Sequence, residues 1–197
     1  MKFPKKYLIP ESCTKYRSEA LQAAGDSWCK FPVIISTLIL VLVVGLPMSW
    51  GFENEPKTFR GIKWGTDINN LPDMIFHTQS GESKVYFRKN DKLKMGAANL
   101  LQIWYFFSMD KLYSVVIMFE EWSNFNSLKT ELFKLHGMGY APNRFTEEYR
   151  WMGSNVIVFF DYNETDDKGR LAYYYLPIMK EQLEERTETD KKADDHP

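Results

Sequence analysis

The richest cluster of potential metal ligands in this 197-residue sequence is the acidic segment from Asp161 to Gly169. A calcium loop of the EF-hand type supplies about six to eight oxygen ligands, with glycine at its sixth position and glutamate at its twelfth. Counted from Asp161, those positions hold Asp166 and Ala172. The pattern therefore predicts a solvated hairpin turn rather than a calcium site, and we predict no metal site elsewhere in the sequence.

Two pairs of adjacent carboxylates, Glu120–Glu121 and Glu147–Glu148, could serve as an acid and a base. Neighbouring residues of a strand point to opposite faces, so neither pair predicts two carboxylates aimed at one substrate. His77 and His136 are the histidines that precede the C-terminal tail, and His136 is expected at a helix end, where the helix dipole favours the imidazolium. No Gly-x-Ser-x-Gly segment provides a nucleophile. We predict no catalytic or cofactor-binding residue and favour a protein that is not an enzyme.

Aromatic residues make up 16% of the sequence, more than a minimal core needs. Trp104 and Phe106 alternate out of phase with Ile103 and Tyr105, so helices that cover one of these faces leave the other exposed or in contact with another molecule. Tyr and Trp are favoured at interfaces because each joins a large apolar area to a polar tip. The candidate partner-binding residues are Trp104, Phe106, Trp122 and Trp151. A thick aromatic core is the alternative interpretation.

Short alternating runs of aromatic and β-branched residues predict the strands that carry these side chains. The predicted strands are Phe59–Trp64, Ser83–Arg88, Leu93–Gly96, Leu101–Phe107, Tyr113–Phe119, Tyr149–Trp151, Val156–Tyr162 and Leu171–Tyr175. A tight turn is expected at Ser108–Asp110. Because tight turns join antiparallel neighbours, the pattern predicts an antiparallel sheet.

Two segments are predicted as helices. Asn124–His136 has apolar residues at helical spacing and is followed by Gly137 as a stop signal. Thr66–Phe76 begins with residues that can cap a helix, although Pro72 restricts its first turn. So few helices cannot cover both faces of a sheet. We therefore predict an α+β fold in which an antiparallel sheet carries two helices on one face.

An uncharged run from Phe31 to Phe52 precedes this domain. A membrane-spanning helix needs about 20 apolar residues, so the run predicts a single N-terminal hydrophobic membrane helix that acts as a signal anchor. The alternative is a cleaved signal peptide with an apolar core at Val33–Leu46, a helix break at Pro47 and a cut after Gly51. We favour the anchor because the segment before the run is long for a signal peptide.

The predicted organisation is a cytoplasmic N-terminal tail (1–30), a signal anchor or signal peptide (31–52), a globular α+β domain (56–178) and a charged disordered tail (179–197). Residues 1–30 hold six Lys or Arg and three Asp or Glu. Cations close to a membrane segment favour the cytoplasmic side. The globular domain is therefore expected in the periplasm or outside the cell.

The charge balance argues against one class of partner. Lys plus Arg number 25 and Asp plus Glu number 26, which gives a net charge of −1. A protein that neutralises many phosphates of a nucleic acid needs a basic excess, so no nucleic-acid partner is expected. The expected partners are the membrane and an envelope protein or glycan, without a cofactor.

The opening of the domain has the sequence Phe59-Arg60-Gly61-Ile62-Lys63-Trp64-Gly65-Thr66. Together with the later Asp110–Val115 strand and the Leu128…Leu132 helix, it resembles a loose set of exported bacterial proteins of uncharacterised function, over about residues 58–176. The element order is also similar to that of small α+β domains of β-lactamase-inhibitor-like and outer-membrane-assembly lipoproteins. Neither resemblance implies catalytic residues, and no lipoprotein cysteine follows the apolar run.

These features lead to one leading hypothesis and two alternatives. The leading hypothesis is a non-catalytic, membrane-tethered envelope domain that binds a protein or glycan through an aromatic sheet face. The first alternative is a hydrolase-like envelope enzyme whose carboxylates gather only in the fold. The second is a soluble exported protein released by signal cleavage.

Overall fold

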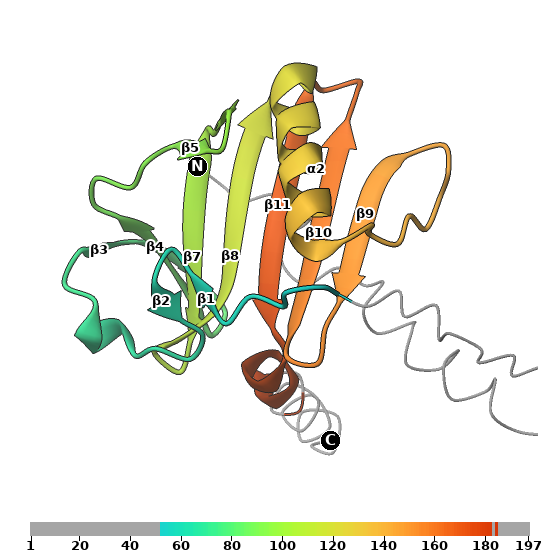
Figure 1. Cartoon of the computed structure of the whole chain (residues 1–197). Coiled ribbons are helices and arrows are strands. Elements are labelled where there is room, and N and C mark those ends of the chain that lie inside the picture. The colour runs from blue at the N-terminus through green and yellow to red at the C-terminus, as the bar shows by residue number, and fades with distance from the viewer. Residues whose placement is uncertain (1–51, 183, 185–197) are drawn as a thin grey trace, which may run out of the picture. The chain divides into compact units, whose positions relative to one another are not determined.

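The computed structural model describes residues 52–182 and 184 (Figure 1). By its internal contacts the chain divides into two units, Met1–Val44 and Gly45–Pro197, and the described residues belong to the second. The predicted cytoplasmic tail, the predicted anchor up to residue 51 and the end of the predicted polar tail lie outside the described residues. Within the described ranges, no helix is long and apolar enough to cross a membrane.

A seven-stranded antiparallel sheet forms the body of the described structure, with the spatial order β3-β4-β7-β8-β11-β10-β9. Most neighbours in the sheet are also neighbours in the sequence, as the predicted tight turns require. The strands are β3 (Met74–Ser80), β4 (Ser83–Arg88), β7 (Gln102–Ser108), β8 (Lys111–Glu120), β9 (Glu147–Met152), β10 (Val156–Asn163) and β11 (Lys168–Tyr175). Two short hairpins complete the described strands: β1 (Thr58–Phe59) with β2 (Ile62–Lys63), and β5 (Lys94–Met95) with β6 (Ala98–Asn99).

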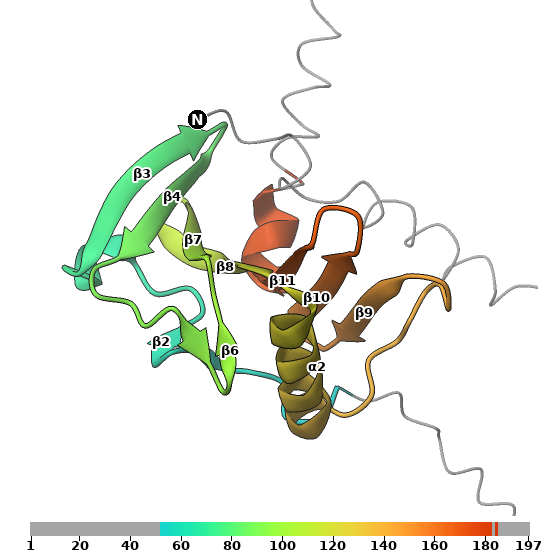
Figure 2. The same cartoon turned by 90° about the horizontal axis from the view of Figure 1, so that it is seen from above.

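The longest described helix, α2 (Trp122–His136), packs on one face of the sheet (Figures 1 and 2). Its apolar stripe of Phe125, Leu128 and Leu132 is at most 1% exposed. The helix carries the chain from β8 to the edge strand β9. The α+β class and the helix predicted at Asn124–His136 are therefore confirmed.

The helix predicted at Thr66–Phe76 is wrong. The structure has a short 3-10 helix, η2 (Ile68–Asn70), whose capping residue Asp67 accepts a hydrogen bond from the Asn69 N–H at 2.8 Å. Strand β3 then begins at Met74 and pairs with β4 at the edge of the sheet. Pro72 explains the break, because proline lacks an N–H and disfavours helical geometry in the residue before it.

A second helical segment lies at the C-terminal end of the described chain. Residues 176–182 are helical and lie at the lower end of the sheet in Figure 1 rather than beside α2. Gln182 is 0% exposed and its Nε2 donates to the Ser83 Oγ at 2.9 Å. That hydroxyl is in turn hydrogen-bonded to the Tyr113 hydroxyl at 2.9 Å. The globular domain therefore extends past its predicted boundary at residue 178.

Two turns depend on residues with a left-handed backbone. Between β7 and β8, Met109 and Asp110 have φ values of 47° and 59°. Between β1 and β2, Arg60 and Gly61 have φ values of 48° and 83°. Positive φ at both central residues is the hairpin geometry whose twist matches that of the flanking strands. The first turn confirms the prediction at Ser108–Asp110, whereas the second divides the predicted strand Phe59–Trp64 into a hairpin.

The main hydrophobic core lies on the α2 side of the sheet. The predicted alternation is correct on β7, where Ile103 and Tyr105 face the core and pair with Ile117 and Val115 of β8. Close packing also requires a glycine at position 169, because a Cβ there would lie 2.1 Å from the Phe119 ring. The sheet and α2 thus enclose a core whose members the alternation largely identifies.

Candidate functional site

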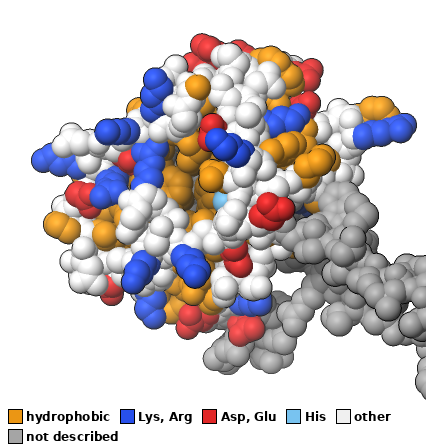
Figure 3. Space-filling view, in the orientation of Figure 1, with side chains coloured by type: hydrophobic (Ala, Val, Ile, Leu, Met, Phe, Trp, Pro, Cys, Tyr) orange, Lys and Arg blue, Asp and Glu red, His pale blue; other side chains and the backbone are white. Residues whose placement is uncertain are grey.

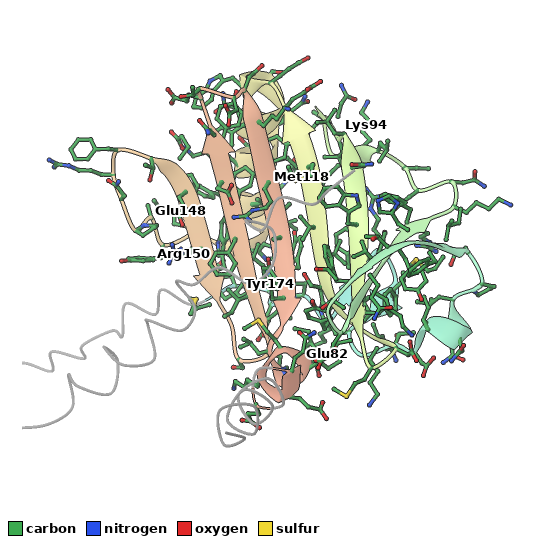
Figure 4. The ribbon with its side chains drawn as sticks, turned by 180° about the vertical axis from the view of Figure 1, so that it is seen from behind. Glu82, Lys94, Met118, Glu148, Arg150 and Tyr174 are labelled. Atoms are coloured by element: carbon green, nitrogen blue, oxygen red, sulfur yellow. The ribbon has the colours of Figure 1, made fainter. Side chains whose placement is uncertain are left out.

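Figure 4 shows the sheet from the side opposite α2, which we call the far face, with Tyr174 and Met118 labelled on its central strands. This face carries an apolar band. Strand register builds the band from two rows of paired residues. The first row is Phe106, Ser114, Tyr174 and Ile157, and the second is Trp104, Val116, Ala172 and Phe159. These eight residues are the far-face band. They lie out of phase with the core residues on each strand, because successive side chains of a strand point to opposite faces.

The residues of the far-face band are buried, except Trp104, which is half-buried. Phe106 and Tyr174 are each 4% exposed, Phe159 is 6% exposed and Val116 is 1% exposed. The Phe159 and Tyr174 rings meet edge to face with their centroids 5.8 Å apart. Because α2 lies on the other side of the sheet, it does not bury these side chains. The far face is therefore an apolar packing surface distinct from the main core.

Ion pairs border the band on one side. Arg170 Nη2 lies 2.7 Å from Asp161 Oδ2, and Arg150 pairs with Glu148. The Arg150 guanidinium also lies 5.5 Å from the centre of the Phe159 ring. Met118, half-buried, stands beside Arg170 in the register (Figure 4). An apolar aromatic centre with Met and Arg at its border has the composition typical of protein interfaces.

The structure brings together two of the four predicted partner-binding residues. Trp104 and Phe106 lie two residues apart on β7, both on the far face. Trp122 begins α2, is 43% exposed and packs against Phe125 and Tyr162 at centroid distances of 4.9 and 5.4 Å.

Trp151, the fourth predicted residue, belongs to the main core. It is 2% exposed and its Nε1 donates to the Gly137 carbonyl at 3.0 Å. The prediction did not include Phe159, which the structure adds to the band. The signal was present in the sequence, because Phe159 is out of phase with Val158 and Phe160 on a strand whose alternation was recognised.

The two carboxylates of the Glu147–Glu148 pair are separated, as their adjacent positions on β9 require. Glu148 pairs with Arg150 on the far face, whereas Glu147 Oε2 accepts hydrogen bonds from Lys129 Nζ at 2.9 Å and Tyr149 OH at 2.7 Å on the α2 side. Burial alone would raise the pKa of Glu147, but these two donors outweigh burial and lower it. Glu147 is therefore held as an anion and is unsuited to act as a general acid near neutral pH.

The acidic segment after Asp161 is a hairpin turn between β10 and β11, as predicted, with Asn163 opposite Lys168. Its carboxylates are engaged within the turn: Asp167 accepts from the Tyr162 hydroxyl, and Asp166 from the Asn163 amide at 3.0 Å. Asp167 raises the pKa of Tyr162 to about 12. Across residues 52–182 and 184, no group of three potential ligands could hold a metal ion.

His136 behaves differently from the prediction. It is 6% exposed, its Nδ1 lies 3.2 Å from the Glu53 carbonyl oxygen, and its ring meets Phe52 at a centroid distance of 4.9 Å. Burial lowers the pKa of His136 and outweighs the hydrogen bonds to backbone groups of Glu53 and Asn54. The neutral imidazole is therefore favoured, and the expectation of an imidazolium at the helix end is wrong.

Comparison of the chain with protein-family models, with curated proteins and with solved structures finds no match. The resemblance to exported bacterial proteins of uncharacterised function therefore stays a prediction.

Proposed function

We propose that this chain is a non-catalytic, membrane-tethered envelope domain that binds another protein through its far face. The far-face band carries the proposal. It joins Trp104 and Phe106 to Phe159 and Tyr174 in one apolar surface, which α2 does not cover. Large rigid aromatic side chains give much contact area for little loss of conformational freedom, so they dominate binding energy at interfaces.

The chemistry of the band favours a protein over a glycan as the partner. Val116, Ala172 and Ile157 make its centre aliphatic as well as aromatic. The polar groups at its border, Arg150 and Arg170, are held by Glu148 and Asp161. An apolar protein segment fits such a surface, because its burial needs few polar partners.

The tether in this proposal rests on the sequence from Phe31 to Phe52, which is long and uncharged enough for a signal anchor. We propose the periplasmic or extracellular side for the globular domain, because residues 1–30 are rich in cations. Alkaline extraction of membranes from cells that make the full chain tests the tether. The chain should stay with the membrane pellet, and complete release into the supernatant would contradict the proposal.

Cleavage of the signal is tested by the mass of the mature chain. A chain that begins at Phe52 would replace the tethered domain with a soluble exported one. The enzyme alternative receives no comparable support from the geometry, because Glu147, Glu148 and Asp161 are each paired with a cation.

The far-face partner is tested by photo-crosslinking in the natural host. A photoreactive amino acid placed at Met118, beside the band, should crosslink the full chain to one discrete second protein, and Trp104→Ala should reduce that product. A matched probe at Met138, which is 77% exposed on the α2 side of the chain, serves as the control. Crosslinks from position 118 only to residues of the same chain, or equal products from both positions, would reject a partner-binding face.

A further inference from the structure

A polar groove of about 430 Å³ lies away from the far-face band, at the junction of β1–β2, β3, β4 and β5. Its lining consists of Arg60, Asp73, Arg88, Lys89, Asn90, Asp91, Lys92 and Lys94. Five of these side chains are cationic and two are anionic, so the lining has a net charge of +3. Figure 3 shows Lys and Arg side chains gathered on this left-hand part of the molecule, although the whole chain has a net charge of −1.

The two arginines of the groove have a structural role. The Arg60 guanidinium contacts the Asp91 carboxylate and donates to the carbonyls of Lys92 at 2.6 Å and Lys94 at 2.8 Å. Arg88 Nε donates to Asp73 Oδ2 at 2.5 Å. Both carboxylates of the lining therefore pair with arginines, and the backbone carbonyls of Lys92 and Lys94 accept hydrogen bonds from the Arg60 side chain.

A hydrogen bond from the core fixes the same loop. The Tyr105 hydroxyl donates to Asp91 Oδ2 at 2.5 Å. Burial and this hydrogen bond both raise the pKa of Tyr105, so the phenol stays protonated as the donor. Asp91 is therefore clamped between Arg60 and Tyr105, and the loop that carries the remaining cations has a fixed shape.

The remaining cations are Lys89, Lys92 and Lys94, and all three are exposed. None of them takes part in an ion pair among the described residues. Three exposed lysines around one concave surface give it a positive potential, which attracts an anion. Their compact ammonium groups suit phosphate oxygens, which they bind as point charges.

We propose that this groove binds a compact ligand that carries two or more phosphate groups. Two phosphate monoesters bring a charge of about −3 to −4 at neutral pH, which matches the lining. A carboxylate ligand would need three separate acidic groups for the same match. The lining consists of charged and amide side chains, so the ligand is hydrophilic and its affinity falls as the salt concentration rises.

The experiment uses the full chain in a neutral detergent and inorganic tripolyphosphate as the probe, with binding measured by calorimetry at about 0.1 M salt, where the Debye length is about 10 Å. The triple variant Lys89→Gln, Lys92→Gln, Lys94→Gln should weaken binding about tenfold or more. The matched control is Lys134→Gln, Lys168→Gln, Lys180→Gln, which removes the same charge from exposed positions outside the groove. Surface substitutions of this kind cost little stability, and unchanged circular dichroism checks that both variants are folded.

The control should bind tripolyphosphate with less than about a threefold change, because charges beyond a Debye length are screened. No binding to the unmodified chain, or equal weakening in both triple variants, would overturn the proposal.

A second arm identifies the source of the phosphate. Short-chain phosphatidylinositol bisphosphate below its micelle concentration competes with tripolyphosphate if the natural ligand is a lipid headgroup, and short-chain phosphatidylcholine serves as its control. Competition by phosphatidylinositol bisphosphate alone supports a lipid source, and no competition, with tripolyphosphate still bound, supports a soluble phosphate compound. Equal competition by both lipids would show that the groove does not select phosphate charge, and would overturn the proposal.

Discussion

The two faces of the sheet are made by the same strands but differ in what packs against them. On the α2 side, the row of Tyr105, Val115, Tyr173 and Val158 packs into one core with the helix. On the far face, the next row along the same strands is also apolar and consists of Trp104, Val116, Ala172 and Phe159. It ends beside the ion pair of Arg150 with Glu148 and faces away from α2. The difference teaches that adjacent residues of one strand serve two surfaces: the first packs into the core with α2, and the second forms the far-face band, through which we propose that a partner binds.

The sharpest test of this comparison uses two adjacent phenylalanines of β10. Phe160 is 0% exposed and stacks on Phe125 of α2 with centroids 4.9 Å apart, so Phe160→Ala should lower the free energy of unfolding by about 4 kcal/mol. Phe159 lies on the far face and is 6% exposed, so Phe159→Ala should cost less, about 3 kcal/mol, at the low end for a buried phenylalanine. Urea unfolding of the purified full chain measures both values. Equal losses would show that the far face is as much a part of the folded core as the α2 side.

A small residue on each face gives the next test. Gly169→Ala places a methyl group against the Phe119 ring and should destabilise the chain by about 1–3 kcal/mol. Ser114→Ala on the far face is the matched control and should change stability by about 0.5 kcal/mol. The midpoints of urea unfolding measure both. Unchanged stability of the glycine variant would mean that Phe119 can move aside, and that the α2 side is packed less tightly than we infer.

The α2-side row also makes one polar contact outside the core. Tyr105→Phe keeps the ring but removes the hydroxyl that donates to Asp91, and it should cost about 1–2 kcal/mol. Tyr86→Phe is the control on the neighbouring strand, because no hydrogen bond of its hydroxyl is found within the described part of the chain. Thermal unfolding of the two variants gives the comparison. Equal shifts in Tm would show that the Tyr105–Asp91 contact adds nothing beyond the packing of the ring.

The smallest expected effect depends on pH and also belongs to the α2 side. Burial lowers the pKa of His136 below its ordinary value of 6.5, so the unfolded chain takes up a proton at higher pH than the folded chain. The contribution of His136 to stability is complete above about pH 6.5 and is lost as the pH falls through the folded pKa.

Urea midpoints measured at about pH 7.5 and about pH 5 test this dependence. They should differ more for the unmodified chain than for His136→Gln, which keeps a hydrogen-bonding side chain at the helix end. An identical difference in both proteins would place the pH dependence elsewhere in the chain.

Much of the fold follows from local pattern. The alternation of Leu101–Phe107, Tyr113–Phe119 and Val156–Tyr162 predicted three strands of the sheet, because the period of side-chain direction along a strand is two residues. Asn124–His136 was predictable from helical spacing and a glycine stop. The helix prediction for Thr66–Phe76 was wrong because capping residues suggested a helix, whereas Pro72 breaks the segment and Met74–Phe76 pair with β4 instead.

The candidate site was only partly predictable, because local pattern shows which residues of a strand share a face but not what packs against that face. The phase of Trp104 and Phe106 indicated that they share a face, and the structure places them so. Trp151 was assigned with them by residue type alone, but the core beneath α2 encloses it. The basic groove was not predicted, because Arg60 and Asp91 are 31 residues apart and are joined only by the fold.

By itself, the sequence determined which residues of each strand share a face, where α2 runs and where the tight turns fall. These properties depend on the period of the backbone and on the φ values that a few residues tolerate, and both are local. Only the tertiary structure decided which face α2 covers, how residues 176–182 attach through Gln182, and that distant cations meet in one groove. Those outcomes depend on contacts between segments far apart in the chain, where packing and charge pairing select one arrangement among many that the local pattern allows.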